Sequence, residues 1–126
     1  MRFKLLDGGG AFALLAALTL LTGCIFAPRP THDPSTLKAI AAESRTLMAA
    51  RPTPTYVTVP KSQWPPVIAS LKPFDVTVFS YGVNIATKPY FDGGWGYFVP
   101  RREGELPKPT DRYSELGHDV YWYQDD

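Results

Sequence analysis

The sequence has a single cysteine, no surplus of charge of either sign, and no internal repeat or low-complexity tract. Its 126 residues include 13 Lys and Arg against 12 Asp and Glu, for a formal net charge of +1. This near-neutral balance lacks the basic surplus that is typical of nucleic-acid binding proteins. One cysteine excludes an intramolecular disulfide and any zinc or iron–sulfur site that needs several cysteines. The length allows one small domain.

Long hydrophobic runs are also scarce, and the one that exists lies near the N-terminus. It covers 11 residues from Ala11 to Leu21 and follows a short positive segment that contains Arg2 and Lys4. The run is too short to span a bilayer, because a transmembrane helix needs about 20 apolar residues. Its length and its flanking charges are typical of a secretory signal peptide.

The apolar run closes with Leu21, Thr22, Gly23 and Cys24. This string resembles the lipobox of bacterial lipoproteins, in which an aliphatic residue, a small residue and Gly or Ala precede a cysteine. The resemblance implies that a diacylglyceryl group joins the Cys24 thiol, and that a signal peptidase recognises residues 21–23 and cuts before Cys24. Cysteine suits this role because its sulfur is a soft nucleophile. Two or three acyl chains, such as palmitate, anchor a protein stably, whereas one gives only marginal binding.

Two other interpretations of Cys24 stay open. It is an ordinary apolar cysteine if the segment is an uncleaved anchor, and 25–27 (Ile-Phe-Ala) also forms a weak ordinary cleavage site before Pro28. In enterobacterial lipoproteins, Asp directly after the lipidated cysteine favours retention in the inner membrane, and here that residue is Ile25. The resemblance therefore implies a lipoprotein of the outer membrane that faces the periplasm.

The chain is predicted to consist of a cleaved signal peptide (1–23), a lipidated tether (24–32) and one domain (33–126). Pro28 and Pro30 favour an extended, semi-rigid tether. In the domain, Asp33 and Pro34 have the residue types of a helix N-cap and first helical position, and apolar residues follow at helical spacing. We therefore expect a helix over 34–50. A second, short helix is expected to start at Pro65-Pro66 and to end at Lys72-Pro73.

Alternating β-branched and aromatic residues predict strands at 75–80, 83–87, 95–99 and 119–124. The segment 56–59, between prolines, is a candidate for a short edge strand. Residues 111–117 are interpreted as a short turn that ends at Gly117, after a loop over 101–110. The sum is an α+β fold in which one longer and one short helix pack on one face of a three- to four-stranded antiparallel sheet. The stretch from Val59 to Pro100 resembles small bacterial proteins that have no assigned activity.

Motifs for catalysis or metal binding are scarce. The string 93–96 (Gly-Gly-Trp-Gly) lacks the residues of a phosphate loop and the spacing of a dinucleotide fingerprint. It predicts a turn with Asp92 and one strand glycine that permits close backbone approach. His118 stands beside Asp119, but adjacent strand residues point to opposite faces, so a surface histidine is expected here rather than a ligand or general base. No serine lies in G-x-S-x-G. We predict no catalytic residue, metal or cofactor.

Aromatic residues near the C-terminal strands are the strongest functional indication. Strand alternation directs about half of them away from the core, which predicts a binding surface formed by Trp95, Tyr97, Tyr121, Trp122 and Tyr123. Such rings combine rigid apolar area with a polar group. The competing interpretation is that these rings simply pack the core.

These observations predict a lipid-anchored, non-enzymatic binding module of the cell envelope. Its expected partners are the membrane, through the lipid on Cys24, and an envelope protein or glycan, with no nucleic acid. One alternative is a glycan- or peptidoglycan-binding lipoprotein that uses surface aromatics. A less favoured alternative is a small hydrolase with a site around His118.

Overall fold

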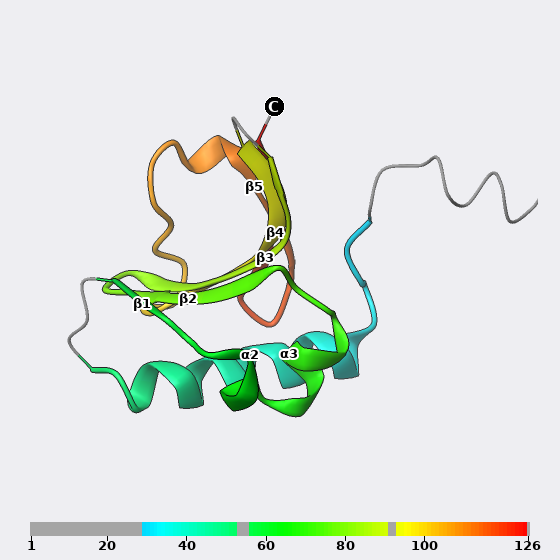
Figure 1. Ribbon diagram of the computed structural model, residues 1–126. Coiled ribbons are helices and arrows are strands. Elements are labelled where there is room, and N and C mark those ends of the chain that lie inside the picture. The colour runs from blue at the N-terminus through cyan, green and yellow to red at the C-terminus, as the bar shows by residue number, and fades with distance from the viewer. Residues whose placement is uncertain (1–28, 53–55, 91–92, 126) are drawn as a thin grey trace, which may run out of the picture.

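The computed structural model describes residues 29–52, 56–90 and 93–125, which form helices packed on a six-stranded antiparallel sheet (Figure 1). The elements in chain order are α2 (Pro34–Ala49), β1 (Tyr56–Thr58), η1 (Lys61–Gln63), α3 (Pro66–Ser70), β2 (Asp75–Phe79), β3 (Gly82–Tyr90), β4 (Gly93–Pro100), η2 (Thr110–Arg112), β5 (Tyr113–Gly117) and β6 (Val120–Asp125). The strand order is β1-β2-β3-β4-β6-β5. The expected α+β class, with one longer and one short helix, is confirmed, but the sheet is larger than predicted.

Strand β5 is the main departure from the expected fold. It covers residues 113–117, which the sequence pattern predicted as a turn. Gly117 pairs with Val120, and the two residues between them, His118 and Asp119, have φ values of 56° and 63°. Positive φ at both central residues is the geometry of a type I′ hairpin turn. The alternation in 113–117 is weak, and pairing with β6 is what makes this segment a strand.

Strand β3 also runs further than expected, because a bulge carries it past Lys88-Pro89. The register against β4 shifts between Ala86 and Lys88, and the pairing then continues. A bulge bends a strand and increases its twist, and it is one of the few places where a sheet accommodates proline.

The glycines of β4 only partly match the expectation. Gly93 and Gly94 lie in β4 and pair with the end of β3, whereas their expected turn partner Asp92 lies outside the described residues. At Gly96, a Cβ atom would overlap the backbone carbonyl oxygen of Ile85 on β3. The expected strand glycine that permits close backbone approach is therefore confirmed at Gly96.

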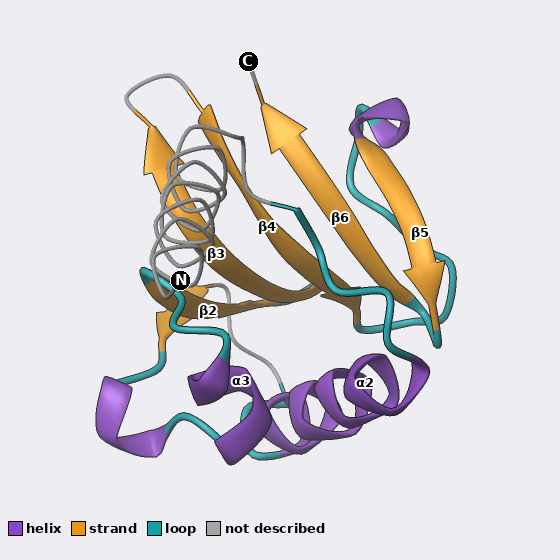
Figure 2. Cartoon of the chain, turned by 90° about the vertical axis from the view of Figure 1, so that its right-hand side faces the viewer, coloured by secondary structure: helices purple, strands orange, loops and turns teal. Residues whose placement is uncertain are grey.

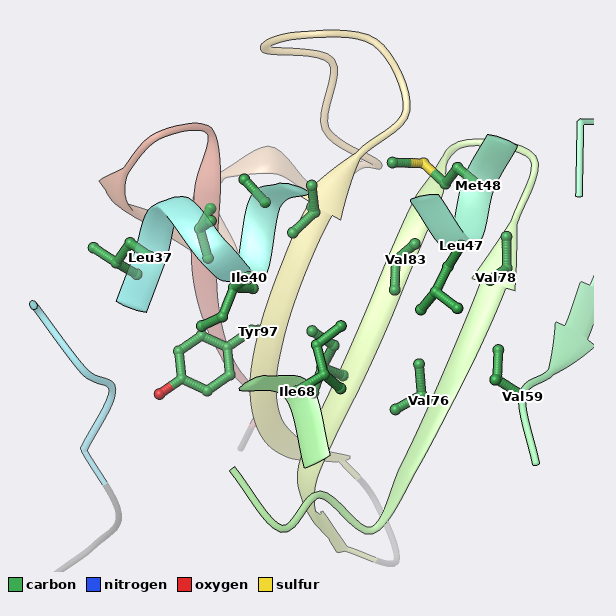
Figure 3. Close-up of a cluster of buried hydrophobic side chains, with 14 of the residues drawn as sticks. Leu37, Ile40, Leu47, Met48, Val59, Ile68, Val76, Val78, Val83 and Tyr97 are labelled. Atoms are coloured by element: carbon green, nitrogen blue, oxygen red, sulfur yellow. The ribbon is translucent and has the colours of Figure 1, made fainter. Parts of the chain in front are cut away.

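Helices α2 and α3 cover one face of the sheet (Figure 2). The predicted start of α2 is confirmed: the carboxylate of Asp33 accepts the backbone N–H of Thr36 at 2.9 Å, and Pro34 occupies the first turn. Figure 3 shows side chains that meet between the two layers, and they are mainly aliphatic. The buried members from the helices and the central strands are Leu37, Ile40, Leu47, Met48, Ile68, Val76, Val78, Val83, Ile85 and Val99.

Two charged side chains connect separate elements: Glu43 joins the two helices, and Arg101 joins the end of α2 to the sheet. The carboxylate of Glu43 on α2 accepts the backbone N–H groups of Val67 and Ile68, at 3.0 and 2.9 Å, and so satisfies the first turn of the short helix α3. The guanidinium of Arg101 donates to backbone carbonyl oxygens at the end of α2 and of strand β2. Its acceptors are Met48, Arg51, Phe79 and Ser80.

The expected signal peptide, the lipobox with Cys24, and residues 24–28 of the tether lie outside the described residues. Among the helices that the structure describes, none combines the length and the apolar character needed to cross a membrane.

Candidate functional site

The aromatic residues expected to form a binding surface are divided between the two faces of the sheet. Trp95, Tyr97 and Trp122 point toward the helix side, are 9%, 4% and 8% exposed, and belong to the core. Their expected exposure is wrong, because these positions of β4 and β6 point to the helix side of the sheet, where the rings join the hydrophobic core. Tyr121 and Tyr123 point to the other face, where Tyr121 is also buried and Tyr123 is partly buried.

The face opposite the helices carries a continuous row of aromatic rings, which we call the aromatic row. Neighbouring rings in the row have centroids 4.9–6.2 Å apart. In spatial order they are Tyr56, Phe79, Tyr81, Phe98, Tyr113 and Tyr123. The row crosses the sheet from the edge strand β1 to the edge strand β5, and α2 and α3 lie on the other side of the sheet (Figure 1). Rings at these separations support one another by offset and edge contacts.

The sheet bends around the aromatic row and encloses a hollow of about 360 Å³, which we call the open-face groove. Residues outside the row that line it include Phe74, Asp75, Thr77, Asn84, Lys88 and Arg112. Three large hydrophobic side chains are exposed among the described residues, namely Tyr56 (64%), Phe74 (64%) and Tyr81 (45%), and all three line this groove. Exposed apolar side chains that gather in one hollow are typical of a binding site.

Polar side chains lie between the rings on the floor of the groove. Thr77 on β2 pairs with Asn84 on β3, and both line the hollow. The amide oxygen of Asn84 is buried and accepts no hydrogen bond from any described residue. Asp75, two residues before Thr77, is partly buried, and this burial raises the pKa of its carboxyl. A buried acceptor without a donor costs about 1–3 kcal/mol, so the floor favours a ligand that donates hydrogen bonds.

Three charged side chains line the groove among the residues that the structure describes. They are Lys88 from β3, Arg112 from η2 and Asp75 from β2. The guanidinium carbon of Arg112 lies 5.9 Å from the centroid of the Tyr113 ring, which is within the range of a cation–π contact. The groove is therefore a mixed surface of aromatic rings, polar side chains and charged groups.

The second candidate region, around His118, has a structural explanation. His118 and Asp119 form the β5–β6 turn, and His118 is exposed, as the sequence predicted. The sequence predicted a strand that begins at Asp119, whereas both residues lie in the turn itself. Asp119 accepts the backbone N–H of Gly104 at 3.2 Å and lies 3.9 Å from Arg45. Asp119 therefore holds the 101–110 segment near the turn and α2, and the described residues contain no cluster of metal-ligating side chains.

Sequence reasoning did not find the groove because residues from all six strands line it. The pattern of β2 does indicate two faces, with Val76 and Val78 on one and Thr77 and Phe79 on the other. What the pattern lacks is the register between strands, which brings Tyr56, Phe98 and Tyr123 onto the same face as Phe79.

No family model, curated protein or solved structure matches this chain.

Proposed function

We propose that the protein is a lipid-anchored binding protein of the bacterial cell envelope, which recognises its ligand in the open-face groove and catalyses no reaction. One observation carries this proposal: the exposed large hydrophobic side chains of the described residues, Tyr56, Phe74 and Tyr81, all line the same hollow. Water-exposed aromatic area is unfavourable unless a ligand covers it. The lipid anchor is supported by the lipobox at residues 21–24.

The position of the N-terminal segment fits a groove that faces away from a membrane. The backbone N–H of Thr31 donates to the hydroxyl of Tyr97 at 2.9 Å, on the helix side of β4. The next residue, Phe98, points to the groove on the other side of the same strand. In Figure 1 the segment from residue 29 and the strands β1 and β2 lie on opposite sides of β4. Residues 24–28 reach at most about 18 Å when fully extended, so a lipid on Cys24 keeps the helix side of the sheet nearest the membrane.

A photo-crosslinking residue in the groove tests the binding site. We would place p-benzoyl-phenylalanine at Tyr81 in the full-length protein, and at Thr46 as a control, because Thr46 is exposed on the outer side of α2. Irradiation of living cells should give a discrete product from position 81 that is absent from position 46. The same product from both positions, or none from position 81, would contradict a ligand in the groove.

The anchor needs a separate test. The N-terminal peptide of the protein from cells should begin at Cys24 and carry the mass of a diacylglyceryl group, with or without a third acyl chain. Cys24→Ser should abolish both the modification and the cleavage, because the thiol accepts the lipid. A peptide from the unmodified chain that retains residues before Cys24 would exclude the lipoprotein assignment.

A further inference from the structure

We infer that the helix side of the domain is a contact surface for a bilayer that carries anionic phospholipids, and that lipid phosphate binds beside Lys61 and Lys72. This inference rests on the proposed lipid anchor and adds a second, electrostatic contact between the domain and the same membrane. Three observations support it: the distribution of charge along the chain, the hollow that the two lysines line, and the position of the N-terminal segment.

Charge is divided unequally between the two layers of the domain. Residues 29–74, which form the helices α2, η1 and α3 and the edge strand β1, contain six Lys and Arg but only two acidic residues, Asp33 and Glu43. Residues 75–126, which contain β2 to β6, have five Lys and Arg and nine acidic residues. The carboxylate of Glu43 already accepts two backbone N–H groups of α3. The helix layer therefore carries the positive charge of the domain, and an anionic surface attracts this layer.

A hollow of about 390 Å³, which we call the lysine hollow, is lined by Lys61 of η1 and by Trp64, Ala69, Lys72 and Pro73. The Nζ atom of Lys61 lies 6.0 Å from the centroid of the Trp64 ring. Both lysines are exposed, and no described carboxylate forms an ion pair with either of them. Ammonium groups form charge-assisted hydrogen bonds with phosphate, and tryptophan rings are enriched at the level of lipid headgroups. The lysine hollow therefore has the side chains that a lipid headgroup needs.

The backbone at Lys72 has a conformation that favours glycine. Lys72 directly follows the last residue of the α3 cap, Leu71, and has a φ of 53°. Glycine is the usual residue in this left-handed conformation after a helix, because a side chain adds steric strain there. A lysine at this position supplies a positive charge where the stability of the fold favours glycine.

The N-terminal segment brings the predicted lipid close to the lysine hollow. Residues 29–31 line a neighbouring hollow together with Leu71, the residue before Lys72. Cys24 precedes Arg29 by five residues, so a lipid on Cys24 stays within about 18 Å of this segment. An anchor of this length gives the domain a high effective concentration at the bilayer surface, so a contact that is weak in solution becomes populated.

A spin label on the full-length, lipidated protein tests this contact. The label is placed at Ser62→Cys on η1 or, as a control, at Ser114→Cys on β5, both of which are exposed positions. Cys24 is the only native cysteine, and its lipidated sulfur does not react with the label. The protein is reconstituted in vesicles of phosphatidylcholine alone, or of phosphatidylcholine with about one third phosphatidylglycerol.

The measured quantity is the accessibility of the label to a water-soluble nickel chelate. At position 62 it should be at least threefold lower in the anionic vesicles than in the neutral ones, whereas at position 114 it should differ less than twofold. Added salt should remove the difference, because salt screens exposed charges. Equal accessibility of position 62 in the two kinds of vesicle, or equal protection of positions 62 and 114, would overturn the inference.

Single substitutions connect the contact to the lysine hollow. One basic side chain near an anionic bilayer changes the contact equilibrium about fivefold. Lys72→Gly and Lys61→Ala should therefore each bring the accessibility of position 62 in anionic vesicles close to its value in neutral vesicles. Glycine suits the backbone at position 72, so circular dichroism should show no loss of thermal stability for Lys72→Gly.

Lys108→Ala is the matched control, because it removes an exposed lysine from the 101–110 segment, outside the lysine hollow. It should change the accessibility of position 62 less than twofold. Equal effects of Lys72→Gly and Lys108→Ala would show a general attraction without a site and would refute the assignment.

This inference and the proposed function fail in different ways. If the N-terminal peptide carries the lipid and position 62 keeps its full accessibility in anionic vesicles, only the membrane contact of the helix side is lost. If the N-terminal peptide retains residues before Cys24, the proposed anchor is lost, and the membrane contact that rests on it is lost as well.

Discussion

The two faces of the sheet carry different kinds of side chain, although the same strands contribute to both. On the helix side, β2 and β3 present Val76, Val78, Val83 and Ile85, all of which are fully buried. On the open side, Thr77, Phe79 and Asn84 of the same strands lie in or beside the aromatic row. The helix side is filled by branched aliphatic side chains that interdigitate with a second layer. The open side has no second layer among the described elements, and its rings shield one another instead.

The helix side of the sheet therefore stabilises the fold, whereas the open side is the candidate surface for recognition. Contacts between helices and sheet bury aliphatic area on folding, which is the main source of stability in a small domain. The open side leaves aromatic area exposed and a buried acceptor without a donor. Proteins tolerate such unfavourable features where a ligand compensates for them. Substitutions on the two faces should therefore have different, and sometimes opposite, effects on stability.

The largest loss of stability is expected from a substitution on the helix side. Ile85→Ala removes three buried carbon atoms from a side chain with 0% exposure, and it should lower the free energy of unfolding by about 2–5 kcal/mol. Urea unfolding monitored by circular dichroism measures this change. Ile85→Val, as a matched control, should cost about 0.5–1.5 kcal/mol. A cost below about 1 kcal/mol for Ile85→Ala would mean that this face is not the stabilising one.

The next largest loss of stability is expected at Gly96, where a Cβ atom would overlap the neighbouring strand β3. Gly96→Ala forces a methyl group against the backbone carbonyl oxygen of Ile85, and overpacking of this kind costs about 1–3 kcal/mol. Thermal and urea unfolding should both show the loss. Ser114→Ala, at an exposed position of the edge strand β5, is the control and should change stability by less than about 0.5 kcal/mol. If both substitutions are neutral, the β3–β4 register described above is wrong.

A smaller effect of opposite sign is expected on the open side. Asn84→Leu removes the buried amide oxygen that lacks a donor, so it should raise the free energy of unfolding by about 1 kcal/mol. Asn84 directly precedes Ile85, so two adjacent residues of β3 report on the two faces. A loss of stability of more than about 1 kcal/mol for Asn84→Leu would show that Asn84 supports the fold.

The smallest change in the free energy of unfolding is expected at the start of α2, in the helix layer, and it depends on pH. Hydrogen bonds from the hydroxyl groups of Thr36 and Ser35, and from the backbone N–H of Thr36, hold the pKa of the Asp33 carboxyl below its ordinary value. The folded-state pKa is thus lower than the unfolded one. The stabilisation is fully present above the unfolded pKa and is lost as the pH falls through the folded pKa.

Asp33→Asn tests this pH dependence, because asparagine also caps helices but does not titrate. The free energy of unfolding should fall less steeply in the variant than in the unmodified protein as the pH is lowered through the acidic range. Identical slopes for the two proteins would show that the Asp33 carboxylate has no preferential hydrogen bonds in the folded state.

Local sequence signals predicted the helix layer well. Asp33 and Pro34 define the start of α2, Arg51-Pro52 follows its end, and the apolar spacing between them marks the buried side. The faces of β2 were also readable from alternation alone. The edge candidate at 56–59 did become strand β1. These features depend on residues within a few positions of one another, which is why one sequence suffices to predict them.

The site depended on pairings between segments distant in the sequence. Residues 113–117 became a strand only because β6 pairs with them. The strongest aromatic candidates, Trp95, Tyr97 and Trp122, are buried because they point to the side of the sheet that forms the hydrophobic core. Alternation indicates that a strand has two faces, but it does not indicate which face the helices cover.

The sequence by itself determined the helix boundaries, the α+β class and the lipobox that predicts an anchor at Cys24, because each depends on short-range chemistry. The tertiary structure alone decided which aromatic residues stay accessible, namely Tyr56, Phe74 and Tyr81. It joined Tyr56, Phe79, the buried Phe98 and Tyr123 in one row through inter-strand register, and it placed the N-terminal segment on the opposite side of the sheet. The physical reason is that register and layer packing minimise exposed apolar area over the whole domain, which no local pattern specifies.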